Sequence, residues 1–165
     1  MRVPIRKPGK FTHQKPDPHL TADKFAELKN KLDSLKKARP KLADEVRRLA
    51  ELGDLSENAA YQIAKGKLRS VNQKIIDLEN HLHLAIIIQP GNDSTSVQIG
   101  HTVTVKINGE QVTYLILGSA ETNPAQGVIS HNSPIGSAIM GHRVGDTVTI
   151  KAKDKLITCT IVNIG

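Results

Sequence analysis

The chain has 165 residues, a net charge of +7 and a single cysteine, Cys159. This length allows one or two domains, and one cysteine excludes an internal disulfide. The basic N-terminus lacks the apolar stretch of a secretory signal, and the longest apolar run, 84–88, is too short to span a bilayer. No Cys/His zinc spacing is present. We therefore expect a cytoplasmic protein.

The positive charge is concentrated toward the N-terminus. Residues 1–19 carry five basic residues and one acidic residue, residues 20–88 carry a net charge of +3, and residues 89–165 are neutral. The first segment is rich in proline and charge, a composition that predicts a disordered tail. DNA, RNA or an acidic protein surface is the expected neighbour of the basic parts, although solubility alone explains the same charge.

Residues 20–88 contain two runs of apolar residues at heptad spacing, the first interrupted at Arg39. The apolar positions are Phe25, Leu28, Leu32, Leu35, Leu42, Val46 and Leu49 in the first run, and Tyr61, Ala64, Leu68, Val71, Ile75, Leu78, Leu82 and Ala85 in the second. Each run holds about four heptads, and the linker is short, which predicts an antiparallel coiled-coil hairpin. Thr21 is the expected N-cap of the first helix, and Gly53 the expected C′ residue that ends it.

The turn between the two helices has the sequence GDLSENAAY, residues 53–61. Asp54 and Glu57 are therefore expected at the tip of a rod, far from any core. Carboxylate oxygens are ligands that Mg²⁺ prefers, but two of them bind it weakly, so a partner would have to supply the others. The same spacing also fits a capping box with Asp54 at N-cap and Glu57 at N3, and both roles can coexist.

Basic side chains lie on both sides of this acidic tip. They are Arg47 and Arg48 before the turn and Lys65, Lys67 and Arg69 after it. We name these five residues the basic collar. They are candidates for contacts with nucleic acid or with an acidic protein surface, and the alternative is an ordinary solvated helix face.

Residues 97–165 follow a polar linker at 89–96 and have the pattern of a small α+β domain. Strands are expected at 102–107, 111–117, 147–151 and 156–162, with a short helix from Ser133 to Met140. Asn108-Gly109 predicts a type I′ hairpin turn between the first two strands. His131 and His142 are expected to be surface or loop residues rather than ligands.

The tip resembles that of the Gre transcript-cleavage factor family (GreA/GreB), usually G-D-L-x-E-N-A-E-Y, and is closer to GreA. Further similarity lies at Arg39-Pro40, Ala64-Lys65, Leu68-Arg69, Ile129-Ser130, Ser133 to Gly136 and Val144 to Asp146. The resemblance covers residues 20–165 and leaves out the basic tail. It implies a coiled-coil hairpin followed by an FKBP-like domain.

The resemblance also implies a function. Members insert the hairpin into the secondary channel of bacterial RNA polymerase and stimulate cleavage of backtracked nascent RNA, so the protein is expected to be a monomeric accessory factor and not itself an enzyme. Asp54 and Glu57 would carry the chemistry by helping to hold a second Mg²⁺ shared with the polymerase. Gly53, Ser56 and Asn58 would shape the tip. The expected docking residues on the polymerase are Ser133, Pro134, Ile135 and Gly136.

One position departs from the family pattern, because Ala60 stands where a third acid is usual. This leaves open a regulator or inhibitor that occupies the channel without promoting cleavage. A third possibility is a coiled coil that binds free nucleic acid through the tail and shaft, with an affinity that falls steeply with salt.

Overall fold

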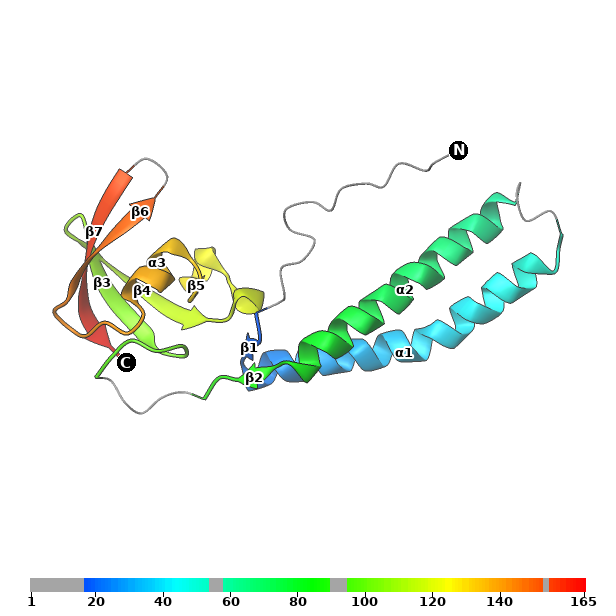
Figure 1. The fold of residues 1–165 in the computed structure, drawn as a ribbon, viewed down its shortest axis with the longest axis horizontal. Coiled ribbons are helices and arrows are strands. Elements are labelled where there is room, and N and C mark those ends of the chain that lie inside the picture. The colour runs from blue at the N-terminus through cyan, green and yellow to red at the C-terminus, as the bar shows by residue number, and fades with distance from the viewer. Residues whose placement is uncertain (1–16, 54–57, 90–94, 153–154) are drawn as a thin grey trace, which may run out of the picture.

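The structure, a computed structural model, describes residues 17–53, 58–89, 95–152 and 155–165. It is elongated, with a helical hairpin at one end and a domain built on a β-sheet at the other (Figure 1). The α+β class predicted from the sequence is confirmed. None of the helices in the described ranges is long and apolar enough to cross a membrane.

The hairpin consists of α1 (Ala22–Ala50) and α2 (Ala59–His83). Thr21 caps α1 as predicted, since its Oγ1 accepts a hydrogen bond from the backbone N–H of Lys24 at 3.2 Å. Gly53 has the left-handed conformation expected of a terminating glycine, with φ +79°, but lies two residues beyond the C-cap Glu51 and so one position later than predicted.

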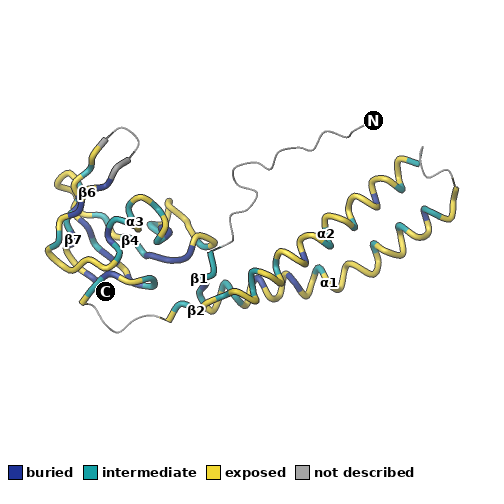
Figure 2. The backbone as a smooth tube through the Cα atoms, in the orientation of Figure 1, coloured by how far each residue is buried: buried dark blue, intermediate teal, exposed yellow. Residues whose placement is uncertain are grey.

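The predicted heptad positions face the partner helix. Five of them are buried, namely Leu28, Leu32, Leu49, Ala64 and Ile75, and the other predicted positions are half-buried, whereas Arg39 is exposed. Most of the remaining hairpin surface faces solvent (Figure 2). Burying one such leucine or isoleucine contributes about 1.5–3 kcal/mol, so a single seam accounts for most of the hairpin's apolar stabilisation.

The sheet domain contains five strands in the order β5-β4-β3-β7-β6. The strands are β3 (Thr102–Ile107), β4 (Glu110–Leu117), β5 (Val128–Ser130), β6 (Thr147–Ala152) and β7 (Lys155–Ile164). Only the β4–β5 pair is parallel among these described strands. Asn108 and Gly109 both have positive φ, 51° and 93°, as the predicted type I′ turn requires.

One face of this sheet carries the core. Val103, Val105, Ile116, Cys159 and Ile161 are almost completely buried there. The short helix α3 (Pro134–Ile139) packs on this face, and Ile139 is fully buried. The 3₁₀ turns η1 (Ser119–Glu121) and η2 (Pro124–Gln126) connect β4 to β5, a strand that the sequence analysis did not predict.

A second, two-stranded sheet lies at the base of the hairpin. In it β1 (His19–Leu20) runs parallel to β2 (Ile86–Ile87), and Leu20 is fully buried. The sequence analysis assigned residue 19 to the tail and did not predict this pairing. The segment that enters α1 is thus held between the hairpin and the sheet domain.

The carboxylate of Asp17 fastens this segment to the sheet domain. It accepts hydrogen bonds from the backbone N–H and the hydroxyl of Ser119, at 2.8 and 2.9 Å, and from the backbone N–H of His19 at 3.1 Å. Glu121 accepts further hydrogen bonds from the backbone and hydroxyl of Thr21. Burial raises the pKa of Asp17, but the hydrogen bonds from Ser119 and His19 outweigh it and lower the pKa to about 2.

Alanine substitutions at Gly118 and at Gly66 should change the free energy of unfolding in opposite directions. A methyl group at Gly118 would lie 1.9 Å from the carbonyl oxygen of His19, whereas one at Gly66, inside α2, would meet no atom within 4 Å. We expect Gly118→Ala to lower the unfolding free energy by about 1–3 kcal/mol, and Gly66→Ala to raise it by about 1 kcal/mol. Urea denaturation followed by circular dichroism measures both, and a stable Gly118→Ala protein would contradict the close packing.

Asp17→Asn should reduce stability in a pH-dependent way. Because folding lowers the pKa of Asp17 from 3.8 to about 2, its contribution is complete above pH 4 and is lost as the pH falls toward 2. We expect a loss of about 1–2 kcal/mol at pH 7, which shrinks between pH 4 and pH 2. Urea unfolding across this pH range measures it, with the exposed Asp33→Asn as control. A difference that stays constant down to pH 2 would refute the assignment.

Candidate functional site

The predicted tip lies at the end of the hairpin farthest from the sheet domain (Figure 1). Gly53 and Asn58 bracket it, because α1 ends at Ala50 and α2 begins at Ala59. The predicted site residues Asp54, Ser56 and Glu57 lie outside the described residues. In the sequence they follow Gly53 and precede Asn58, the N-cap of α2.

Asn58 forms the N-cap of α2. Its Oδ1 accepts a hydrogen bond from the backbone N–H of Tyr61 at 3.0 Å. The capping-box interpretation, which placed Asp54 at N-cap and Glu57 at N3, is therefore wrong for this helix. Asparagine caps a helix as well as aspartate does, but the sequence analysis considered only Asp54 for this position.

The residues in the first turn of α2 have different environments. Tyr61 is half-buried at its predicted seam position, and the ammonium group of Lys65 lies 5.5 Å from the centre of its ring, within cation–π distance. Ala60 is exposed, and this first turn contains no acidic residue.

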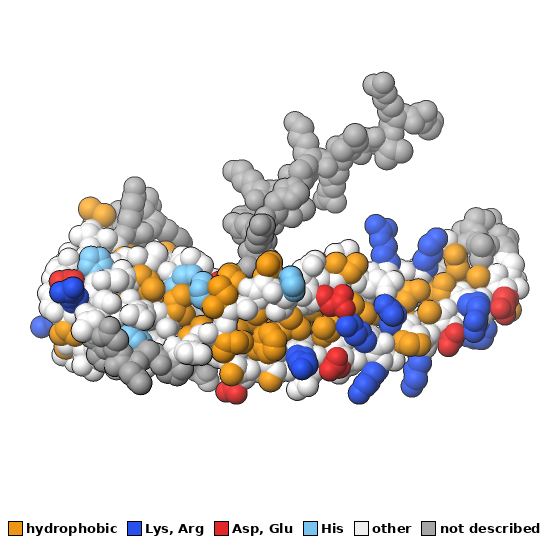
Figure 3. All heavy atoms as spheres, turned by 60° about the horizontal axis from the view of Figure 1, so that its bottom comes forward, with side chains coloured by type: hydrophobic (Ala, Val, Ile, Leu, Met, Phe, Trp, Pro, Cys, Tyr) orange, Lys and Arg blue, Asp and Glu red, His pale blue; other side chains and the backbone are white. Residues whose placement is uncertain are grey.

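All five residues of the basic collar are exposed. Figure 3 shows lysine and arginine side chains projecting from the shaft of the hairpin. Arg47 forms an ion pair with Asp44 at 2.9 Å, but both side chains are largely exposed, so this pair is weak. The collar is thus available to a polyanion that approaches the shaft.

The predicted docking residues lie at the start of α3 and have different environments. Ser133 is the N-cap, with its hydroxyl accepting from the N–H of Gly136 at 3.0 Å. Pro134 is exposed and Ile135 half-buried, whereas Gly136 is buried, and a methyl group there would lie 2.1 Å from the carbonyl oxygen of Ser130. Gly136 is therefore a packing residue.

An apolar cavity of about 250 Å³ opens beside α3. Its lining consists of Ile107, Ile129, Ser133, Pro134, Ile135, Ile150 and Ile157. Three of the four predicted docking residues thus share one surface hollow, which a partner's apolar side chain could enter.

The structure also brings together three residues that the sequence analysis did not combine, Asp17, His19 and His131. His131 lies in a turn, as the expectation of a surface or loop residue allowed, but only 17% of its side chain is exposed. More than 100 residues separate it from the other two, so no local spacing could have indicated the group.

Comparisons with known proteins agree over both parts of the chain. The N-terminal domain model of the transcription elongation factors matches residues 19–87, and the GreA/GreB C-terminal domain model matches residues 92–165. Transcription elongation factor GreA of Roseiflexus sp. (strain RS-1) is 39% identical over 150 residues, which cover 88% of this chain and 96% of that protein. GreA of Bacillus cereus is 38% identical, with coverages of 88% and 94%.

A solved structure with partial similarity is GreA factor homolog 1 (Gfh1) of Thermus thermophilus. It is 25% identical, covers 88% of this chain and 97% of its own, and has a TM-score of 0.41. The family assignment rests on the sequence matches, which span the hairpin and the sheet domain alike. The chain therefore belongs to the GreA/GreB family of transcription elongation factors.

Proposed function

We propose that this protein binds bacterial RNA polymerase through the secondary channel and stimulates endonucleolytic cleavage of backtracked nascent RNA. The observation that carries the proposal is a family tip motif at the free end of a rigid rod. A helix the length of α2, 25 residues, spans about 38 Å. Such a rod reaches into a channel while the sheet domain stays at its entrance.

Asp54 and Glu57 are the residues proposed to act at the reaction centre. Their carboxylates suit Mg²⁺, and because two carboxylates do not complete an octahedral shell, the polymerase and the RNA supply the other ligands. When bound, Mg²⁺ polarises the phosphodiester and activates water for hydrolysis. Capping of α2 by Asn58 makes no demand on the carboxylate of Asp54. The protein then contributes ligands to a site that belongs mainly to the polymerase.

We propose that the basic collar guides the hairpin into the secondary channel of the polymerase. Guanidinium and ammonium groups bind phosphate oxygens and acidic side chains through charge-assisted hydrogen bonds. The side chains of Arg48, Lys67 and Arg69 are exposed, form no hydrogen bond or ion pair with any described residue, and are suited to this contact.

The tip carboxylates can be tested with isosteric changes. We expect Asp54→Asn and Glu57→Gln each to slow cleavage of labelled RNA in stalled elongation complexes by about 100-fold or more, since a metal ligand contributes several kcal/mol to such a transition state. Glu45→Gln, an exposed acid on the shaft, is the matched control and should cleave normally. Unchanged cleavage by both tip variants would refute the assignment.

A second candidate function follows from Ala60. With no acid in the first turn of α2, the protein could occupy the channel as a regulator or inhibitor that lacks cleavage activity. The same assay separates the two functions. Binding to polymerase without cleavage by the unaltered protein would support the regulator, and cleavage lost in the tip variants would support the cleavage factor.

Docking through α3 can be tested at Pro134. This residue is exposed at the first position of the helix, where glutamate is tolerated and favoured by the helix dipole. We expect Pro134→Glu to fold but to bind polymerase about tenfold or more weakly, because the new charge must be desolvated. Thr158→Glu, exposed on the opposite face of the sheet, is the control. Equal affinities of the two variants would place docking elsewhere.

A further inference from the structure

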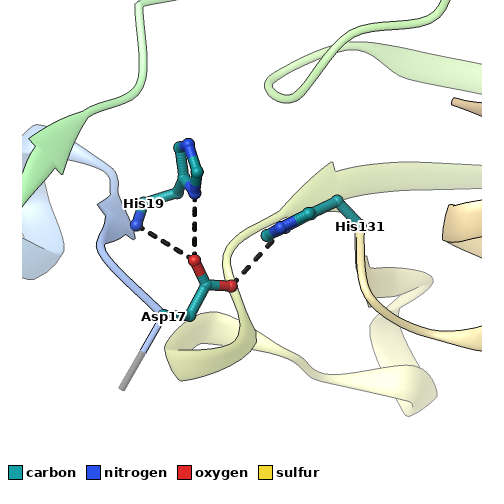
Figure 4. Close-up of side chains that lie close together, drawn as sticks. All are labelled: Asp17, His19 and His131. Carbon is teal, nitrogen blue, oxygen red and sulfur yellow. Dashed lines mark hydrogen bonds and ion pairs between the residues drawn. The ribbon is translucent and has the colours of Figure 1, made fainter. Parts of the chain in front are cut away.

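The junction between the hairpin and the sheet domain contains three metal-ligating side chains that the proposed function does not use. Asp17 and His19 come from the segment that enters α1, and His131 follows β5 (Figure 4). Nδ1 of His19 lies 3.0 Å from one carboxylate oxygen of Asp17, and Nδ1 of His131 lies 3.5 Å from the other. One ligand atom from each residue lies within 4.8 Å of the others.

We propose that Asp17, His19 and His131 form a binding site for a divalent transition metal, best matched by Zn²⁺. Two imidazole nitrogens and one carboxylate oxygen are a donor set that zinc uses, with a fourth position left for water. At zinc–ligand distances of about 2.0–2.1 Å, tetrahedral ligands are about 3.3 Å apart. The nitrogen–oxygen separations of 3.0 and 3.5 Å involve different carboxylate oxygens of Asp17, and one ligand atom from each residue lies within 4.8 Å of the others. The three ligand atoms therefore have to draw closer together when a cation binds.

The orientation of the three side chains favours convergence on one point. The rings of His19 and His131 meet edge to face, with centroids 5.1 Å apart and planes at 76°, and do not stack. Figure 4 shows both rings directed at the carboxylate from different sides. Small movements of the two rings are enough to place a cation between the three ligand atoms.

The Asp17 carboxylate is buried, and hydrogen bonds fix its orientation. Only 5% of the Asp17 side chain is exposed, and the backbone N–H and hydroxyl of Ser119 fix its orientation, as outer-sphere partners of metal ligands do. The His19 side chain is 31% exposed and leaves a route of entry from solvent.

A cluster held only by hydrogen bonds is the competing explanation. In that arrangement the Nδ1–H group of His19 donates to Asp17 at 3.0 Å, and that of His131 donates to the carbonyl oxygen of Leu117 at 3.4 Å and lies 3.5 Å from Asp17. Metal binding requires the other tautomer, in which Nδ1 is free of its proton and Nε2 carries it. The metal site and the hydrogen-bonded cluster therefore differ in whether the protein binds a cation, which can be measured.

The full-length protein, stripped of metal with a chelator, should be titrated with Zn²⁺ by calorimetry in the presence of excess Mg²⁺. We expect one tight site, and visible absorption bands of tetrahedral Co²⁺ when cobalt replaces zinc. Asp17→Asn and His131→Gln should each weaken zinc binding by at least about tenfold, since loss of even an outer-sphere partner costs 10–100-fold. The half-exposed His19→Gln, the variant least disturbing to the fold, should do the same.

His142→Gln is the matched control. His142 also faces a carboxylate, Asp146 at 3.3 Å, but this exposed pair has no third ligand in the described structure. Its removal should leave zinc affinity and the cobalt spectrum unchanged. Equal zinc affinities of the unaltered protein and all three site variants would overturn the proposal, because the other histidines of the chain would then hold the metal. Absence of tight binding by the unaltered protein would overturn it as well.

Discussion

The antiparallel seam between α1 and α2 is the constraint on which the rest of the structure depends. Its apolar residues face each other along both helices, while nearly every other side chain of the hairpin faces solvent. A hairpin built this way has no broad core and must be long and narrow. The same seam that stabilises the helices therefore also holds the far ends of α1 and α2 away from the sheet domain (Figure 1).

A rod of this kind is useful only if its direction relative to the sheet domain is defined. The structure provides this definition through a short segment, residues 17–21. That segment pairs with β2, approaches Gly118 closely and presents Asp17 to Ser119. Because Gly118 leaves no room for a side chain and the Asp17 carboxylate accepts hydrogen bonds from Ser119 and from the backbone of His19, the segment has one favourable position. A small number of polar contacts thus fixes the arrangement at the junction, whereas apolar packing fixes the arrangement of the two helices along the rod.

Features encoded by neighbouring residues were predictable from the sequence. The heptad seam, the Thr21 cap, the Asn108-Gly109 turn and α3 each depend on a few residues close in the chain, and each was confirmed. Two-residue strands such as β1 carry no periodicity and were missed. The capping box placed Asp54 at the N-cap, and the start of α2 shows that Asn58 takes this position instead. The contact of Asp17 with His131 depends on tertiary packing, which no local pattern encodes.

The two proposed metal sites differ in chemistry and so can act independently. The tip offers oxygen ligands alone, which suit Mg²⁺, whereas the junction adds two imidazole nitrogens, which strongly favour a transition metal. We therefore expect that magnesium at cellular excess does not displace zinc from the junction. A metal at the junction would act on the direction of the rod, and a metal at the tip on the reaction. Since the two sites lie at opposite ends of the hairpin, either proposal can fail without affecting the other.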